Sequence, residues 1–273
     1  MNDFSRSTLL GKSVHRMGLS SGYGLDEAGV RVALDLGVNY FWYTRSTMPA
    51  MTAPLKERVK SDRESLFIAS GPTLGYTAGQ VRRGCEDALK KLGTDHLDLL
   101  QVFWVGKTSR LSDSVLGELN RLKEEGKCRG IGVSIHDREK AGKLAQDKTL
   151  DVLMLRYNAG HPGAETDIFP HVGQGADKVG VVTYTSTRWG TLLKAGGPDI
   201  TRSATAGECY RFALSHPAVD VVLTAPGSIA ELQQNFKAIE EGPLDPQGVS
   251  FIRDLGKKIR ASSPMRAGMF EGF

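Results

Sequence analysis

Short apolar runs alternate with longer amphipathic segments along almost the whole chain. Residues 97–104 (LDLLQVFW) are apolar nearly throughout, which is typical of a strand buried on both faces of a parallel sheet. Residues 25–36 carry apolar side chains at helical spacing and are followed by Gly37, so they predict a helix closed by a glycine. The two patterns repeat in turn, and this alternation predicts an α/β protein.

The predicted strands and helices follow one another in a regular order. Strands are predicted at 16–19, 38–42, 65–70, 97–104, 129–134, 152–157, 179–184 and 219–224. Helices are predicted at 25–36, 77–92 (with Thr77 as the N-cap), 112–125, 137–146, 164–172, 204–215, 229–240 and 246–259. Repeated strand–helix units in about 250 residues predict one (β/α)₈ TIM barrel over residues 1–273, with its active site at the carboxyl ends of the strands. A doubly wound open sheet is the alternative, but segment 18–24 (GLSSGYG) lacks the spacing of the dinucleotide-binding fingerprint.

Composition and charge exclude several classes of function. The formal net charge is +4, and the basic residues of segment 56–64 alternate with acidic ones, which favours a solvated helix face over a nucleic-acid patch. No apolar stretch approaches the ~18 residues of a membrane span, and the first ten residues lack a signal-peptide core. The odd number of widely spaced cysteines (Cys85, Cys128, Cys209) fits reduced thiols. We therefore expect a cytoplasmic protein with no nucleic-acid or membrane partner.

Five segments resemble the motifs of one enzyme family and occur in the same order. They are 35–41 (DLGVNYF), 92–101 (LGTDHLDLLQ), 122–134 (LKEEGKCRGIGVS), 181–193 (VVTYTSTRWGTLL), and the Pro226-Gly227 turn with Asn235. In their residues and in their order along the chain, these segments resemble the motifs of the aldo-keto reductases, whose members reduce carbonyl groups with a nicotinamide cofactor. The resemblance covers nearly the whole chain and implies the barrel fold of that family.

The same resemblance assigns the family's catalytic aspartate, tyrosine, lysine and histidine to Trp42, Thr47, Gly71 and Phe103. A carbonyl reductase needs an acid that protonates the oxygen as hydride reaches the carbon. Of the four side chains present, only the weakly acidic Thr47 hydroxyl can donate a proton. The resemblance thus implies a divergent member without the standard tetrad. Tyr43 offers a phenol nearby, but without a neighbouring cation to lower its pKa of about 10.

The family's cofactor pocket is retained only in part. The matching positions are Ser134, Tyr184, Gly190, Gly227, Ser228 and Asn235. Ile135 and Met154 replace an asparagine and a glutamine of the nicotinamide site. Glu231 stands near the place of the arginine that binds the 2′-phosphate, where a carboxylate would repel that group. The resemblance implies NADP or NAD as the cofactor, while these replacements argue against NADP in particular.

Polar and aromatic side chains gather near the ends of the fifth to seventh strands. They are His136, Arg156, Tyr157, Asn158, His161, Glu165, Arg188 and Trp189. Arginines and histidines at one mouth suit an anionic small molecule or peptide. His136, Arg156 and His161 are the candidate catalytic residues, with His136 as the acid–base group. The predicted substrate contacts are Trp42, Tyr43, Phe103, Trp104, Tyr157, Arg188 and Trp189.

Each of these candidates also has a purely structural interpretation. His136 can cap the following helix, and Arg156 can pair with Glu165 or Asp167. Arg188 can bind a backbone carbonyl, while Trp42 and Phe103 can fill a vacated pocket. His161 and His171 lack metal-ligand spacing, so no metal site is predicted.

Three functions stay open on the sequence alone. The favoured one is a repurposed barrel that binds a small molecule or peptide at its carboxyl-terminal face, with non-redox chemistry or none. The second is a divergent NAD(P)(H)-dependent oxidoreductase with a relocated proton donor such as His136 or Tyr43. The third is a pseudoenzyme that serves a protein partner. Convergence of His136, Arg156, His161 and Arg188 on one cavity would favour a ligand site, and scatter would favour a partner-binding scaffold.

Overall fold

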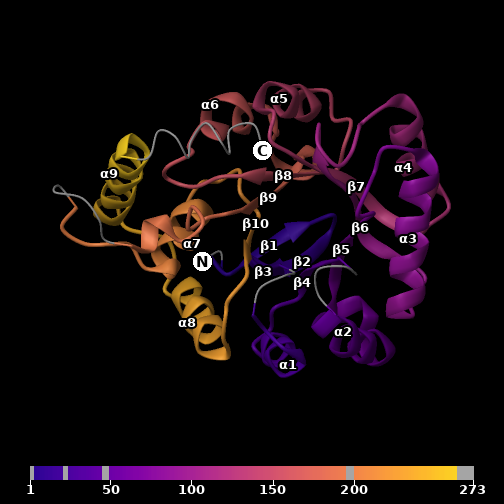
Figure 1. Cartoon of the computed structure of the whole chain (residues 1–273), viewed down its shortest axis with the longest axis horizontal. Coiled ribbons are helices and arrows are strands. Elements are labelled where there is room, and N and C mark those ends of the chain that lie inside the picture. Colours follow the sequence, from indigo (N-terminus) through magenta and orange to yellow (C-terminus); the bar gives the residue numbers. More distant parts are fainter. Residues whose placement is uncertain (1–2, 21–23, 45–48, 195–199, 263–273) are drawn as a thin grey trace.

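A computed structural model describes residues 3–20, 24–44, 49–194 and 200–262 of the chain. Eight parallel strands close into a barrel in the order β10-β3-β4-β5-β6-β7-β8-β9, with helices around the outside (Figure 1). The barrel strands are β3 (Met17–Ser20), β4 (Tyr40–Tyr43), β5 (Phe67–Ser70), β6 (Leu97–Val105), β7 (Cys128–Ile135), β8 (Val152–Arg156), β9 (Gly180–Tyr184) and β10 (Val221–Thr224). The predicted (β/α)₈ class is confirmed.

Most of the described α-helices begin after a side chain that accepts a hydrogen bond from a backbone N–H of the first turn. Thr77 accepts from the Gln80 N–H, and the Gln80 side chain completes a capping box, so the predicted N-cap is confirmed. The helices are α1 (Glu27–Asp35), α2 (Pro49–Asp62), α3 (Ala78–Leu92), α4 (Asp113–Glu124), α5 (Arg138–Gln146), α6 (Ala164–Asp167), α7 (Ala206–Leu214), α8 (Ile229–Glu240) and α9 (Pro246–Ser262). Short 3₁₀ turns lie at η1 (Arg63–Ser65), η2 (Phe169–His171), η3 (Gly175–Asp177) and η4 (Thr191–Leu193). The single helix predicted at 164–172 is instead split into α6 and η2.

An antiparallel hairpin, β1 (Arg6–Leu9) and β2 (Lys12–His15), precedes the barrel and was not predicted. Its two turn residues, Leu10 and Gly11, have φ of 50° and 74°, as a two-residue hairpin turn requires. Leu9 and Val14 join the core inside the barrel, so the hairpin closes the amino-terminal end. The mouth at the carboxyl ends of the strands is therefore the end available for a site.

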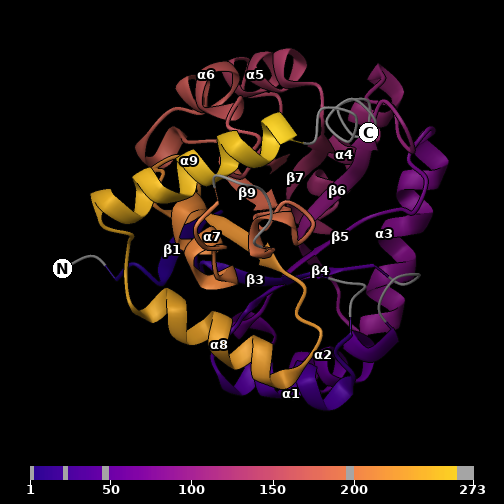
Figure 2. The same ribbon diagram turned by 60° about the vertical axis from the view of Figure 1, so that its left-hand side comes forward.

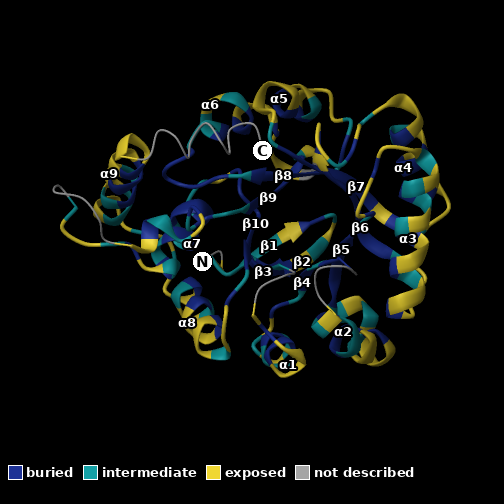
Figure 3. Ribbon diagram, viewed as in Figure 1, coloured by how far each residue is buried: buried dark blue, intermediate teal, exposed yellow. Residues whose placement is uncertain are grey.

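Two hydrophobic cores lie on the two sides of the barrel wall. Strand residues of one phase fill the interior, among them Tyr40, Leu99 and Met154, with Trp42 and Tyr184 above them. Residues of the other phase, such as Phe41 and Tyr43, pack between the strands and the helices. The strands are accordingly buried on both faces, while the helices expose their outer faces (Figure 3). This alternation decides which strand-end side chains reach the mouth.

The last helix lies over the later part of the barrel. α9 packs on α7 and on the η4 turn, and it brings its carboxyl end to the same side as α5 and α6 (Figure 2). Cys85, Cys128 and Cys209 are all buried free thiols. Within the described ranges, no helix has the length and apolar character that a membrane span needs.

Candidate active site

One half of the mouth, at the ends of β4, β5 and β6, is closed by aromatic rings. The Trp42 and Phe103 rings meet edge to face, with their centroids 5.2 Å apart. At Gly71, an added Cβ would lie 1.8 Å from the Gln101 carbonyl oxygen and 3.3 Å from the Phe103 ring. This half therefore has no room for a side chain at position 71. Thr47 lies outside the described residues.

The other half, at the ends of β7, β8 and β9, is polar. Arg156 and Tyr184 are register partners on neighbouring strands. The Tyr184 hydroxyl lies 3.3 Å from Nε2 and 3.4 Å from Nδ1 of His136, and the two rings are nearly perpendicular. The structure thus brings together a phenol, an imidazole and a guanidinium that the sequence placed on three separate strands.

Burial sets the protonation of this pair. Burial, together with the positive charge of Arg156, lowers the pKa of His136 to about 4. Burial also raises the pKa of Tyr184 to about 12, against the opposing effects of the hydrogen bond with Ser134 and of the charge on Arg156. At neutral pH the phenol is protonated and the imidazole is neutral, so the phenol can donate a proton and the ring can accept one.

Several buried polar groups on the inner side of the barrel have no hydrogen-bond partner among the described residues, among them the side-chain amide of Gln101 and the hydroxyl of Tyr40. The Ser134 hydroxyl also lies on this side, close enough to the Tyr184 hydroxyl for a hydrogen bond between them to lower the pKa of Tyr184. A Cβ on Gly132 would touch the Gln101 side chain, which shows that Gln101 points inward. Such groups are rarely left unsatisfied, so they are suited to a polar ligand group. Sequence reasoning missed Gln101; its signal was a polar residue in a stretch of β6 that is otherwise apolar from Leu99 to Val105.

His161 lies in a second polar corner of the mouth, beside Arg188 and Trp189. Its ring meets the Trp189 indole edge to face at 6.0 Å, and the Arg156 guanidinium lies 5.8 Å over the same indole. Arg188 is 3 % exposed and Trp189 is 49 % exposed. His136, Arg156, His161 and Arg188 therefore share one side of the mouth, as a ligand site requires.

Tyr43 and Tyr157, two of the predicted substrate contacts, do not lie at the mouth. Tyr43 is fully buried against α2, where its hydroxyl lies 3.0 Å from the Thr52 hydroxyl. Tyr157 also faces the helices and donates to Glu165 at 2.6 Å. Both stand in the outward phase of their strands, so neither reaches the mouth.

Asn235, predicted to contact the cofactor, points into the protein. It is 6 % exposed, and its amide donates to the Thr224 hydroxyl at 3.3 Å. Asn235 thus links α8 to β10 and does not present its amide to a ligand.

Trp104, another predicted substrate contact, lies near the end of β6. It is half exposed and has φ of 47°.

The turn before α8 is already occupied by a carboxylate. Glu231 accepts from the Gly227 N–H at 2.8 Å, and the Ser228 hydroxyl accepts from the Glu231 N–H as the N-cap. A Cβ on Gly24 would lie 2.6 Å from the Gly227 Cα, so the loops after β3 and β10 touch. Gly190 has φ of 77° and starts the η4 turn. The resemblance implies that Gly227 and Ser228 bind a phosphate. A phosphate bound there would have to displace the Glu231 carboxylate from the Gly227 N–H or share this N–H with it.

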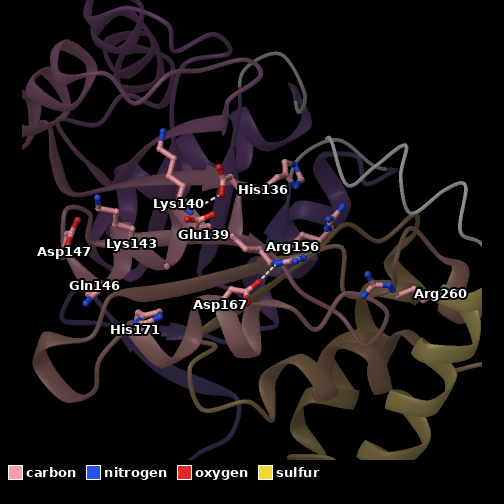
Figure 4. A pocket seen from close by; sticks show the side chains of 13 residues that line it. His136, Glu139, Lys140, Lys143, Gln146, Asp147, Arg156, Asp167, His171 and Arg260 are labelled. Atoms are coloured by element: carbon pink, nitrogen blue, oxygen red, sulfur yellow. Dashed lines mark hydrogen bonds and ion pairs between the residues drawn. The ribbon is translucent and has the colours of Figure 1, made fainter.

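An open cleft of about 1280 Å³ adjoins the polar half of the mouth. His136 and Arg156 line it between the residues of α5 on one side, such as Lys143, and Arg260 of α9 on the other (Figure 4). Asp137, not His136, caps α5. Asp167 binds Arg138 at 2.6 Å and Glu165 binds Arg253 at 2.9 Å. In the part of the chain that the structure describes, no cluster of His, Cys, Asp and Glu could hold a metal ion.

Comparison with known proteins agrees with this architecture. The model of the aldo/keto reductase family matches residues 25–206, which is more than half of the chain. The chain belongs to the aldo/keto reductase family. This aldo-keto reductase homologue is 22% identical to L-galactose dehydrogenase from Arabidopsis thaliana over 255 residues, covering 78% of this chain and 77% of that protein. It is 27% identical to methylglyoxal reductase from Escherichia coli over 191 residues, covering 65% and 66% of the two chains.

Solved structures share the fold of this aldo-keto reductase homologue. The holo form of an aldo-keto reductase from Bacillus halodurans superposes with a TM-score of 0.75 at 20% identity, covering 92% of this chain and 96% of that one. A likeness at this level of identity supports the barrel alone. What the mouth does must therefore be argued from its own residues.

Proposed function

We propose that this aldo-keto reductase homologue is a divergent NAD(P)(H)-dependent oxidoreductase whose catalytic groups have moved across the mouth. The observation that carries the proposal is the contact of the Tyr184 hydroxyl with the His136 ring beside Arg156. A phenol, an imidazole and a cation are the kinds of group that the family resemblance assigns to catalysis. Here they stand at the carboxyl ends of β9, β7 and β8 instead of around β4 to β6.

The implied positions in the other half support the move. Lysine at position 71 would drive its Cβ into the Gln101 carbonyl, and the Phe103 ring packs on Trp42 where the resemblance places a histidine. Neither Trp42 nor Phe103 can act as a general acid at neutral pH. Loss of the standard tetrad is thus part of the proposal, together with its replacement.

Side chains at the mouth and at the start of α8 fit parts of a nicotinamide cofactor. The Gln101 amide, which has no partner among the described residues, and the nearby Ser134 hydroxyl can donate to and accept from a carboxamide. Such a cofactor, when bound, would supply a hydride. At α8, the exposed carboxylate of Glu231 would repel a 2′-phosphate but can accept from a ribose hydroxyl, which favours NAD(H) over NADP(H).

The residues of the polar half then move one proton for each hydride. The Tyr184 hydroxyl donates its proton to the substrate's carbonyl oxygen while the carbonyl carbon receives hydride, and the product is an alcohol. The positive charge of Arg156 stabilises the phenolate left behind. His136, which touches the phenol and lines the open cleft, returns a proton from water.

The direct test compares two tyrosines at the ends of strands. NADH and NADPH are first titrated into the protein by calorimetry, and turnover is then followed on a panel of aldehydes and 2-oxo acids. Tyr184→Phe should lower kcat by about 10²-fold or more, the usual contribution of a positioned acid. Tyr43→Phe, which removes a phenol that faces α2, should leave kcat within about twofold, because its partner is Thr52.

Two results would overturn the proposal. Equal loss of kcat in both variants would show that Tyr184 has no special role. Failure of either cofactor to bind up to millimolar concentration would favour the second candidate, a repurposed barrel that binds a ligand without hydride transfer. The contact of Glu231 with the Gly227 N–H supports this second candidate, because a carboxylate already occupies the turn where the resemblance places a cofactor phosphate.

A further inference from the structure

The turn after β9 is held in an unfavourable backbone conformation. Thr185, Arg188 and Trp189 have φ of 57°, 51° and 53°, and Gly190 follows at 77°. Non-glycine residues are disfavoured in this left-handed region, and they persist there only where their surroundings fix them. The turn therefore places the side chains of Arg188 and Trp189 in defined positions at the mouth.

Arg188 is directed inward past a glycine. A Cβ on Gly160 would lie 2.7 Å from the Arg188 Cδ and 2.9 Å from its Nε, so only glycine leaves room for this side chain. The Arg188 Nη1 donates to the Thr191 hydroxyl at 3.2 Å. Arg188 is 3 % exposed, so its guanidinium is buried beside this corner. The fold thus brings a second cation to the corner that already holds Arg156.

His161 adds a hydrogen-bond acceptor to the same corner, and its tautomer follows from its neighbours. The Asn158 Oδ1 accepts from the Gly160 N–H at 3.0 Å, and its Nδ2 donates to the Thr185 carbonyl at 2.9 Å, which fixes the orientation of the amide. The Nδ1 of His161 lies 3.2 Å from that Oδ1 and must carry the proton. Its Nε2 therefore holds the lone pair.

The Nε2 atom of His161 is buried and has no hydrogen-bond partner among the residues that the structure describes. Burial, together with the charges of Arg156 and Arg188, lowers the pKa of His161 to about 3. The ring accordingly stays a neutral acceptor between two cations throughout the physiological pH range. Trp189, half of which lies in solvent, covers the corner against both His161 and Arg156.

We propose that this corner is a binding subsite for a small hydroxylated anion. The anionic group, a carboxylate or a phosphate, lies on Arg156 and Arg188, whose planar guanidinium groups match either oxyanion. A hydroxyl of the same molecule donates to Nε2 of His161, and the Trp189 indole turns outward to admit it. Sugar acids and sugar phosphates combine both groups. The subsite stands on these contacts alone and does not depend on the proposed hydride transfer.

Calorimetry with four probes on the full chain tests both halves of the inference. D-gluconate and glucose 6-phosphate carry the anion and the hydroxyls, glucose carries only the hydroxyls, and hexanoate carries only the anion. We expect one of the first two to bind at least tenfold more tightly than glucose and hexanoate, because an unmet buried acceptor discriminates strongly against a ligand without the matching donor. The tighter of the two identifies the anionic group as carboxylate or phosphate.

Variants locate the binding. Arg188→Met and Arg156→Met should each weaken binding of that probe at least tenfold, and His161→Phe should reduce its advantage over hexanoate. Lys143→Met is the matched control, since Lys143 lines the same cleft from α5 without contacting this corner; it should bind as the parent does. Trp189→Phe should abolish any change in tryptophan fluorescence that the probe causes. If the buried Arg188 proves necessary for folding, the partly exposed Arg156 still decides the test.

Several outcomes would overturn the inference. Binding of gluconate and glucose 6-phosphate no tighter than glucose would exclude the anion contact. Equal binding of hexanoate would exclude the His161 contact, and equal losses in Lys143→Met and Arg188→Met would reduce the effect to the general charge of the cleft. Probe binding without NADH turnover would refute the proposed function while leaving the subsite in place.

Discussion

The two halves of the barrel mouth are made by equivalent strand ends, yet they hold opposite kinds of side chain. At the ends of β4 to β6, Trp42 and Phe103 pack edge to face and fill the space. At the ends of β7 to β9, His136, Arg156 and Tyr184 form a polar cluster beside an open cleft. One fold can therefore close the half where its family places catalysis and offer acid–base groups in the other, because each strand end is substituted independently of the barrel.

The largest effect should come from adding one methyl group to the closed half. Gly71→Ala places a Cβ against a backbone carbonyl that cannot move without shifting β6, so the free energy of unfolding should fall by about 3 kcal/mol or more. Urea denaturation measures this loss. Gly117→Ala in α4 is the control, since its Cβ would meet nothing within 4 Å, and alanine in a helix should stabilise by about 0.5–1 kcal/mol. Similar stability of both variants would show that the closed half is not rigid.

The next effect tests whether Arg156 acts on Tyr184. Arg156→Met removes the charge that opposes the raised pKa of the phenol, so that pKa should rise and kcat should fall about tenfold, or about 1.4 kcal/mol. The pH–rate profile should move to higher pH on its alkaline side, which a merely structural role would not cause. Arg110→Met provides the matched loss of an arginine, because Arg110 lies over Tyr76 on the loops of the other half. If the pH–rate profile moved equally in both variants, the effect would not come from the position of Arg156 beside Tyr184.

The free energy of unfolding, measured as a function of pH, tests the burial of His161 in the polar half of the mouth. The pKa of His161 is lowered from 6.5 to about 3 in the folded protein, so below pH 6.5 the unfolded chain binds a proton that the folded chain does not. Stability should therefore fall as pH falls from 6.5 towards 3, by at most about 1.4 kcal/mol per pH unit for this group. His161→Gln should make the decline shallower. An unchanged slope would mean that His161 is protonated in the folded state.

The smallest effect concerns the turn that the carboxylate occupies. Glu231→Ala frees the Gly227 N–H and removes a negative charge from the start of α8, so the dissociation constant for NADPH should fall about threefold to tenfold. Binding of NADH should not tighten, since NADH has no 2′-phosphate. Calorimetric titration of both cofactors gives the comparison, and identical responses would exclude Glu231 as a determinant of cofactor choice.

Phase along the strands was the main limit of prediction from sequence. Tyr43 and Tyr157 were assigned to the mouth, although each follows an inward-facing residue and so faces the helices. In strands buried on both faces, the apolar pattern carries no alternation from which the phase could be read. Of the helix α2, only a solvated face within 56–64 was expected and no bounds were predicted, because the helix contains Pro54 and its apolar positions lack a clear helical period. Thr77, in contrast, was predicted correctly because capping depends only on neighbouring residues.

The sequence by itself determined the alternation of strands and helices, and hence the barrel, because helical and extended periodicities are local properties of the chain. It also determined that polar side chains follow β7, β8 and β9. Only the tertiary structure decided that Tyr184 meets His136 and that Arg156 stands beside them, because strand register and barrel closure bring distant segments together. The space around Gly71 was likewise decided in three dimensions, since it depends on how closely the backbone of β6 approaches.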